Sequence, residues 1–253
     1  MSSLPCIKTL TPVSGLDELV ERDKEHDCEG FGAHGICVKV DAVADLPTCF
    51  GRFRVVGFWN NRDGKEHVAL VHGDVLGAAD VMTRLHSECL TGDALGSLRC
   101  DCREQLGFAL QRLAAERCGI LLYMRQEGRG IGLLNKLRAY SLQDAGLDTV
   151  DANLALGFRD DERDYAVAAH MCASLTVKSL RLITNNPKKV AELERHGIHV
   201  SSRVPHVIAA NEHNRFYLQT KAIRSGHFID VDAPQYASEQ DDPVVIADPQ
   251  STG

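Results

Sequence analysis

The sequence has no long apolar run and little positive charge, and each deficit excludes a class of protein. No stretch of about eighteen apolar residues occurs, so we expect no membrane-spanning helix. Residues 1–15 lack a basic flank followed by an apolar segment, so we expect no secretory signal and a cytoplasmic protein. The formal net charge is −7, which argues against a nucleic-acid-binding protein. A small anionic ligand stays compatible with this charge, because clustered arginines can bind phosphate on an acidic protein.

The sequence also lacks the cysteine pattern of a disulfide framework, because its nine cysteines are odd in number and irregularly spaced. In a cytoplasmic protein we expect reduced thiols, which leaves metal binding as their functional use. Cys89, Cys100 and Cys102 form a close group with the spacing C-x10-C-x-C and no fourth cysteine nearby. Three thiolates with one open position are typical of catalytic zinc, whereas His86 as a fourth ligand would make the site structural. The alternative is three buried thiols without a metal, because free cysteine is often buried.

The hydrophobic pattern indicates an α+β fold, that is, a mixed α/β protein. Short runs rich in Val, Ile and Phe predict strands at 36–43, 50–59, 67–72, 81–85, 119–124, 180–184 and 198–200. Helical spacing predicts helices at 104–116, from 133 onward, at 165–175 and at 187–196. The turn residues at 60–64 favour a hairpin between the second and third strands.

The order of these elements predicts one catalytic domain. The first half is rich in strands, and helices alternate with strands after about residue 100, so we place a single domain at 36–232. Residues 1–35 show no sustained period and are expected to form a poorly ordered arm. Residues 233–253 are acidic and contain proline, which predicts a second tail.

Two groups of residues have the chemistry for phosphate binding. Glycines at 128, 130 and 132 lie between a predicted strand and a helix, where backbone N–H groups favour anions, and Arg125 and Arg129 flank them. This glycine spacing alone often marks only a turn. Lys188 and Lys189 follow Pro187 at a predicted helix start, although such a pair is usually a solvated face.

Four segments resemble GTP cyclohydrolase II. They are RLHSECLTGDALGSLRCDCREQ at 84–105, RQEGRGIGLLNKLRAYSLQDAGLDTVDAN at 125–153, DERD at 161–164 and TNNPKK at 184–189. The resemblance runs over about residues 50–230 in the family's order. It implies a mixed α/β homodimer that uses one Zn²⁺ per subunit, with Mg²⁺ on the substrate's pyrophosphate. The implied reaction opens the guanine imidazole ring of GTP, releases formate and pyrophosphate, and leaves a diamino-phosphoribosylamino-pyrimidinone, the first step of riboflavin biosynthesis.

The resemblance also implies roles for individual residues. Cys89, Cys100 and Cys102 correspond to the zinc ligands, Asp161 to a proton acceptor and Arg163 to a residue assigned as nucleophile. The family more often has Asn where this chain has Gly130. Substrate contacts are implied for Arg84, Leu85, His86, Ser87, Glu88, Gln105, Glu127, Gly128, Arg129, Tyr140, Thr149, Thr184 and Lys189.

Chemistry qualifies two of these roles. Arg163 stays protonated, so stabilising the charge of departing pyrophosphate suits it better than nucleophilic attack. Asp161 and Arg163 can share one face only if residues 161–163 are extended or form a loop. Without the resemblance, this pair would be interpreted as a surface ion pair.

Three hypotheses about the function remain at this point. The first is the complete reaction, and the second is a relative that stops at the formamide or serves another pathway. The third is a zinc-stabilised nucleotide sensor without turnover. The motifs of GTP cyclohydrolase I are absent, and the segment before residue 36 is shorter than a fused synthase domain would be.

Overall fold

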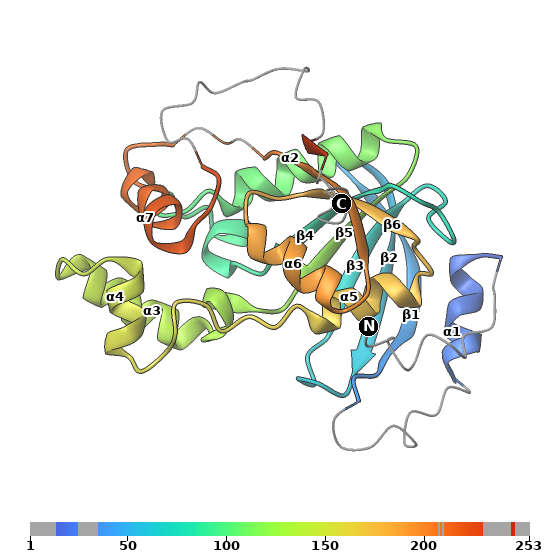
Figure 1. Ribbon diagram of the computed structural model, residues 1–253, viewed down its shortest axis with the longest axis horizontal. Coiled ribbons are helices and arrows are strands. Elements are labelled where there is room, and N and C mark those ends of the chain that lie inside the picture. Colours follow the sequence, from blue (N-terminus) through green and yellow to red (C-terminus); the bar gives the residue numbers. More distant parts are fainter. Residues whose placement is uncertain (1–13, 25–34, 207, 209, 230–243, 246–253) are drawn as a thin grey trace, which may run out of the picture.

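The protein is built around one mixed β-sheet (Figure 1). The computed structural model describes residues 14–24, 35–206, 208, 210–229 and 244–245. The strand order of the sheet is β1-β2-β3-β5-β4-β6-β7-β8. The strands are β1 (Val38–Thr48), β2 (Gly51–Asn60), β3 (His67–His72), β4 (Val81–Ser87), β5 (Gly119–Met124), β6 (Ser179–Ile183), β7 (His199–Val204) and β8 (Val244–Val245).

The sheet changes character along its width. From β1 through β2 and β3 to β5 every pair is antiparallel, and the predicted hairpin joins β2 to β3. From β5 through β4 and β6 to β7 every pair is parallel. Parallel neighbours need a crossover connection, and helices supply it after β4 and after β6. The predicted mixed fold, with helices alternating after about residue 100, is confirmed.

Some helices pack on the two faces of this sheet, and others extend beyond it. They are α1 (Leu16–Lys24), α2 (Cys102–Ala115), α3 (Leu133–Asp144), α4 (Thr149–Ala155), α5 (Ala166–Ser174), α6 (Pro187–Arg195) and α7 (Arg215–Ser225). A short π-helix (Leu90–Ala94) and a 3₁₀ turn (Glu127–Gly130) follow β4 and β5. In the part of the chain described, no helix is both long and apolar enough to cross a bilayer.

Alternation along the strands builds two cores, one on each face. In β5, Ile120 and Leu122 join the larger core with the fully buried helix α5, whereas Leu121 joins the smaller core with α2. Successive side chains of a strand point to opposite faces, so one buried strand serves both cores. The helices α3, α4 and α7 lie beyond the sheet, on the left in Figure 1, where they flank the site described below.

The two predicted tails need correction where the structure describes them. Helix α1 lies inside the expected N-terminal arm and packs against β1, with Leu19 completely buried. Asp23 at its end accepts a hydrogen bond from the Val40 backbone N–H at 2.7 Å. In the predicted acidic tail, the two residues of β8 pair with Ser202 and Arg203 of β7. The remaining residues of both predicted tails lie outside the described part.

Other differences are local. The strand predicted to be last at 198–200 is β7, and β8 follows it; neither α4 nor α7 was expected.

Cys37 is disulfide-bonded, so the expectation of reduced thiols is wrong at that position, whereas Cys49, Cys118 and Cys172 are free. A disulfide depends on two Cα atoms lying within about 7 Å, which sequence spacing does not reveal.

Candidate active site

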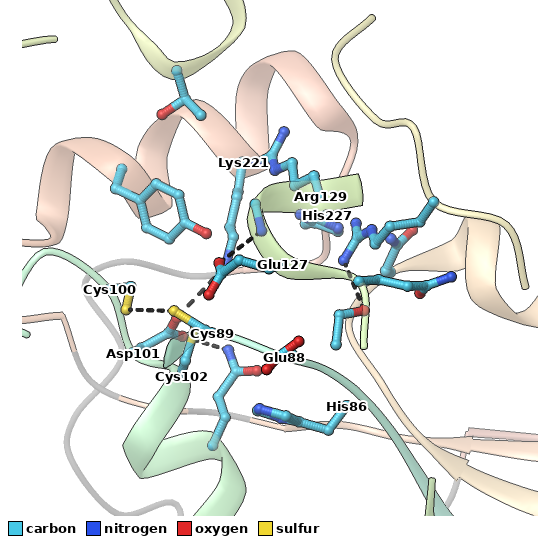
Figure 2. A pocket seen from close by; sticks show the side chains of 18 of the residues that line it. His86, Glu88, Cys89, Cys100, Asp101, Cys102, Glu127, Arg129, Lys221 and His227 are labelled. Atoms are coloured by element: carbon cyan, nitrogen blue, oxygen red, sulfur yellow. Dashed lines mark hydrogen bonds and ion pairs between the residues drawn. The ribbon is translucent and has the colours of Figure 1, made fainter. Parts of the chain in front are cut away.

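The site lies where the parallel strands end. The segments that follow β4, β5 and β6 leave the sheet at the same edge, because parallel strands share their carboxyl ends. They contribute residues 87–89 and 99–102 from the end of β4 onward, residues 126–129, 131 and 136 after β5, and residues 184–186 and 189 after β6 to one pocket. Three segments far apart in the sequence therefore meet in the pocket shown in Figure 2.

The three predicted cysteines meet in that pocket. Their sulfur atoms all lie within 4.8 Å of one another, and Cys89 Sγ is 3.7 Å from Cys100 Sγ. A tetrahedral zinc site with bonds of about 2.3 Å separates its sulfurs by about 3.8 Å, so the spacing fits this metal. Among the described residues, the cluster offers three ligand atoms, and His86 is not one of them. The donor set therefore favours three protein ligands with one open position over a closed structural site.

A glycine keeps the space between these sulfurs open. A Cβ added to Gly92 would lie 2.7 Å from Cys100 Sγ and 2.9 Å from Cys102 Cβ. The Gly92 N–H also donates to Cys89 Sγ at 3.4 Å. The π-helix that carries Gly92 thus encloses the cluster without filling it, which sequence spacing did not suggest.

Lys136 of α3 and Glu127 of the 3₁₀ turn after β5 bind to the cysteine cluster and its surroundings. Lys136 Nζ donates to Cys89 Sγ at 3.1 Å and to Glu127 Oε1 at 2.8 Å. Burial alone would lower the pKa of Lys136, but Glu127 and the Cys89 thiol outweigh it and raise the pKa. The other oxygen of Glu127 accepts the Leu90 N–H at 2.7 Å. A charged Lys136 beside sulfur stabilises the thiolate form that metals require.

A buried histidine is linked to the cluster through Asp93. His86 Nε2 lies 3.0 Å from Asp93, and Asp93 also accepts hydrogen bonds from the Tyr123 hydroxyl at 2.8 Å and the Cys89 N–H at 3.0 Å. Burial lowers the pKa of His86. Because Asp93 binds the Nε2 proton, the neutral ring leaves Nδ1 as an acceptor, and this atom has no partner in the described structure.

Buried cations form the second half of the site. Arg84 donates to the carbonyl of Ile183 at 3.0 Å and to the Gln105 side chain, and burial lowers its pKa to about 10. Lys189 Nζ donates to the carbonyl of Leu85 at 2.7 Å. Burial and the nearby charges of Arg84 and Arg163 lower the pKa of Lys189. The site therefore concentrates positive charge in a protein of net charge −7.

Arg163 is held by a two-pronged ion pair. Its Nε lies 2.8 Å from Asp161 Oδ1 and its Nη2 lies 2.5 Å from Oδ2, while Nη1 is 3.5 Å from the Ser87 hydroxyl. Residues 161–163 form a loop, as the predicted pairing on one face requires. Asp161 itself does not line the pocket, so it orients Arg163 from behind.

The glycine loop presents one more arginine. Arg129 has a left-handed backbone with φ of 57°, and its guanidinium donates to Asp160 at 2.5 Å. Left-handed backbone is costly for a residue with a side chain, and here it turns Arg129 into the pocket. A Cβ on Gly130 would lie 3.0–3.1 Å from atoms of Glu162, so the loop and the 161–164 segment pack closely there.

Tyr140 closes the pocket beside the cysteines. Its hydroxyl lies 3.4 Å from the Thr91 hydroxyl, and Arg99 lies 4.9 Å above its ring centre. Burial raises the pKa of Tyr140 to about 12, so the hydroxyl stays protonated. Thr149, at the start of α4, lines the same pocket.

The structure brings together most of the residues singled out from the sequence. Of the residues with a role implied by the family resemblance, only Leu85 and Asp161 do not line the pocket; the Leu85 side chain is part of the larger core. Among the candidates for phosphate binding, Gly128, Arg129 and Lys189 line the pocket, whereas Arg125, Gly130, Gly132 and Lys188 do not. The predicted substrate contact of Leu85 stays a prediction, and the Leu85 carbonyl accepts a hydrogen bond from Lys189 beside the pocket. Sequence reasoning missed four lining residues with polar or aromatic side chains near the C-terminal end of the described chain: His206, Tyr217, Lys221 and His227.

A thiolate cluster facing buried cations defines a candidate metal-dependent enzyme for an anionic substrate. Comparison with known proteins identifies the group. Residues 39–205 match the GTP cyclohydrolase II family. GTP cyclohydrolase-2 of Pseudomonas paraeruginosa is 60% identical over 188 residues, which is 74% of this chain and 92% of that protein. GTP cyclohydrolase-2 of Tolumonas auensis is 58% identical over 192 residues, or 76% and 98% of the two chains.

A longer relative matches as well. The riboflavin biosynthesis protein RibBA of Bacillus subtilis is 57% identical over 222 residues, covering 84% of this chain and 56% of that protein. The chain is an enzyme of the GTP cyclohydrolase II family.

Proposed function

We propose that this chain hydrolyses GTP, opening the imidazole ring of guanine and releasing formate and pyrophosphate. The observation that carries the proposal is the union of two parts in one pocket. A cluster of three thiols forms one part, and buried cations contributed by Arg84, Arg163 and Lys189 form the other. The thiol cluster could hold a metal whose bound water attacks the guanine base, and the buried cations could bind the polyphosphate of GTP.

We further propose zinc as the resident metal, held by Cys89, Cys100 and Cys102. Sulfur spacing, the space kept by Gly92 and the cation Lys136 beside Cys89 support this assignment. Bound zinc would supply a water of lowered pKa, the form needed to attack C8 of guanine at neutral pH. Mg²⁺ is expected to arrive with the substrate's phosphates, where it offsets their charge.

The chain's own residues divide the remaining work. His86, with Asp93 binding Nε2, offers Nδ1 as a proton acceptor or base contact at the cluster. Arg163, held by Asp161, stabilises charge on the α-phosphate as pyrophosphate departs. Tyr140 contacts the guanine. The other proposed substrate contacts are Arg84, Ser87, Glu88, Gln105, Glu127, Gly128, Arg129, Thr149, Thr184 and Lys189, together with the Leu85 backbone.

The product and its context follow from the same proposal. The complete reaction leaves 2,5-diamino-6-(5-phosphoribosylamino)pyrimidin-4(3H)-one. The name of the Bacillus subtilis relative supports a place in riboflavin biosynthesis. We also propose a cytoplasmic homodimer with one catalytic domain at 36–232, extended by helix α1. Exposed leucines on neighbouring helices, Leu134 and Leu137 on α3 and Leu154 on α4, support a subunit contact.

One assay tests this function against its alternatives. Purified protein with GTP and Mg²⁺ is scored separately for formate, pyrophosphate and the pyrimidine product, with ATP as the control base. We expect all three products from GTP and almost none from ATP, because a site built for one base edge leaves polar groups unpaired with another. Pyrophosphate without formate would indicate a reaction that stops before ring opening. Formylated pyrimidine without free formate would indicate an enzyme that stops at the formamide. Binding of GTP without any product would make the chain a sensor and refute the proposal.

A further inference from the structure

The C-terminal end of helix α7 is fixed against the pocket by contacts to three other segments. Arg224 pairs with Asp148 of the α3–α4 connection at 2.6 Å. The Ser225 hydroxyl donates to Asp160 at 3.0 Å, and the Phe228 N–H donates to the carbonyl of Asn185 at 2.9 Å. The segment from Lys221 to His227 is therefore held in place by three other parts of the chain.

A left-handed turn then directs two side chains inward. Gly226 has φ of 68°, which ends the helix, and the His227 N–H donates to the carbonyl of Lys221 at 3.2 Å. Lys221 and His227 enter the pocket from the side opposite His86, with His227 beside Arg129 (Figure 2). One capping turn thus places both side chains in the same cavity.

Lys221 is paired less closely with a carboxylate than two arginines of the pocket are, so its N–H donors stay available to an anion. Arg129 and Arg163 have close carboxylate partners in Asp160 and Asp161. Lys221 Nζ is 3.5 Å from Asp101, beyond a good hydrogen bond, and lies 4.3 Å above the Tyr217 ring.

Lys189 is likewise available to bind an anion. Its hydrogen bond goes to the neutral carbonyl of Leu85, so this contact leaves its charge without compensation. Lys189 and Arg84, whose described hydrogen bonds go to neutral groups, therefore carry charge that an incoming anion can neutralise, and Lys221 offers N–H donors beside them.

His227 completes this group. Its Nδ1 is buried and has no hydrogen-bond partner among the described residues. Burial and the charges of Lys221, Arg129, Arg163 and Lys189 lower the pKa of His227 to about 3, so the ring is neutral in the absence of an anion. A polar atom left unpaired among four cations is costly in the free protein and well suited to an anion that enters among them.

We propose that Lys221 and His227 are ligands of the substrate's polyphosphate, completing an anion site whose other members are Arg129, Arg163 and Lys189. This inference rests on the proposed function for the identity of the substrate. The anion site itself is defined by the residues, so it can be tested with an anion alone. Helix α7 then belongs to the binding machinery, and the pyrophosphate end of the substrate lies beneath it.

Calorimetric binding of inorganic pyrophosphate with Mg²⁺, and separately of guanosine, tests the proposal without turnover. We expect Lys221→Met and His227→Ala to weaken pyrophosphate binding about tenfold or more, the value of a charge-assisted hydrogen bond, and to leave guanosine binding unchanged. Lys221→Arg should retain most of the affinity. Lys188→Met is the matched control, because Lys188 is an exposed cation next to Lys189 that does not line the pocket.

The outcomes separate this inference from the proposed function. Pyrophosphate affinity within about twofold of wild type in both variants overturns it, as does a wild-type protein that binds no pyrophosphate. Equal weakening of pyrophosphate and guanosine would show a structural role for α7 and also overturns it. If Lys221→Met does not fold, as judged by circular dichroism, His227→Gln decides the question. Absence of formate from wild-type protein with GTP refutes the proposed function alone.

Discussion

The space beside the three cysteines is so small that a single methyl group would fill it. Gly92 lies there with an ordinary backbone conformation, so its glycine character serves the cavity and not a turn. Lys136 and Asp93 hold the same cluster from two other directions. At the scale of single residues, the site depends on the absence of a side chain at Gly92 as much as on the three cysteines.

Gly92→Ala should therefore abolish metal binding, because the new Cβ would lie 2.7 Å from Cys100 Sγ. We expect zinc content measured by elemental analysis to fall from one per chain to nearly none, as in Cys100→Ser. Gly107→Ala is the matched control, since its Cβ would make ordinary contacts at 3.6–3.7 Å with Phe50. Full zinc occupancy in Gly92→Ala would show that the metal is held elsewhere.

Arg163→Ala should slow pyrophosphate release by about 10²–10³, the usual effect of removing one group that stabilises developing charge. Arg163→Lys should recover little of this rate, because an ammonium cannot form the two-pronged contact with Asp161. A coupled assay for pyrophosphate measures the rate. Arg159→Ala is the control, because Arg159 forms an exposed ion pair with Glu162 in the same loop. A rate within a few-fold of wild type in Arg163→Ala would reduce the Asp161 pair to a structural contact.

Helix α1 packs onto the domain, although its sequence was expected to form part of a poorly ordered arm. Leu16, Leu19 and Val20 have helical spacing, and Ser14 and Glu18 bond each other at the helix start. These signals are present in the sequence, but nine residues are too few to predict a stable helix without a partner. The partner is β1, which lies beyond the intervening segment.

Leu19→Ala should destabilise the whole domain by about 2–5 kcal/mol, because a fully buried leucine leaves a cavity in the larger core. Urea unfolding followed by circular dichroism gives the change in free energy. Glu21→Ala, on the exposed side of the same helix, is expected to change it by less than about 0.5 kcal/mol. An unchanged unfolding curve for Leu19→Ala would mean that α1 is an independent arm.

Across the whole molecule, buried histidines make stability depend on pH. Burial, with His196 nearby, lowers the pKa of His170 from 6.5 to about 4. Between these values the unfolded chain binds a proton that the folded chain does not. The contribution is therefore complete above pH 6.5 and is lost as the pH falls toward about 4. Burial also lowers the pKa of His67, which lies at the start of β3.

His170→Gln should flatten this dependence. Urea unfolding at pH 7 and pH 5 should show a smaller loss of stability in the variant than in wild type, by roughly 2 kcal/mol. His213→Gln, which changes an exposed histidine, is expected to follow wild type. The comparison between variants also removes the effect of metal loss at low pH, because all three proteins keep the same cysteines. Parallel curves for wild type and His170→Gln would contradict the prediction.

The sequence by itself determined the local features. Strand β3 and strand β5 have the predicted bounds, and α6 begins at the predicted proline with Asn186 as its cap. The cysteine spacing identified the candidate metal ligands, and the family's motifs identified most pocket residues. These features are encoded within a few neighbouring residues, where side-chain period, turn chemistry and ligand type act directly.

Only the tertiary structure decided which distant residues meet. It placed Lys221 and His227 opposite His86, docked α1 on β1 and put Gly92 between the sulfurs. The physical reason is that parallel strands collect their carboxyl ends at one edge, whatever their separation along the chain. Which side chains then share the pocket depends on helix docking and core packing across that edge, and no local pattern carries this information.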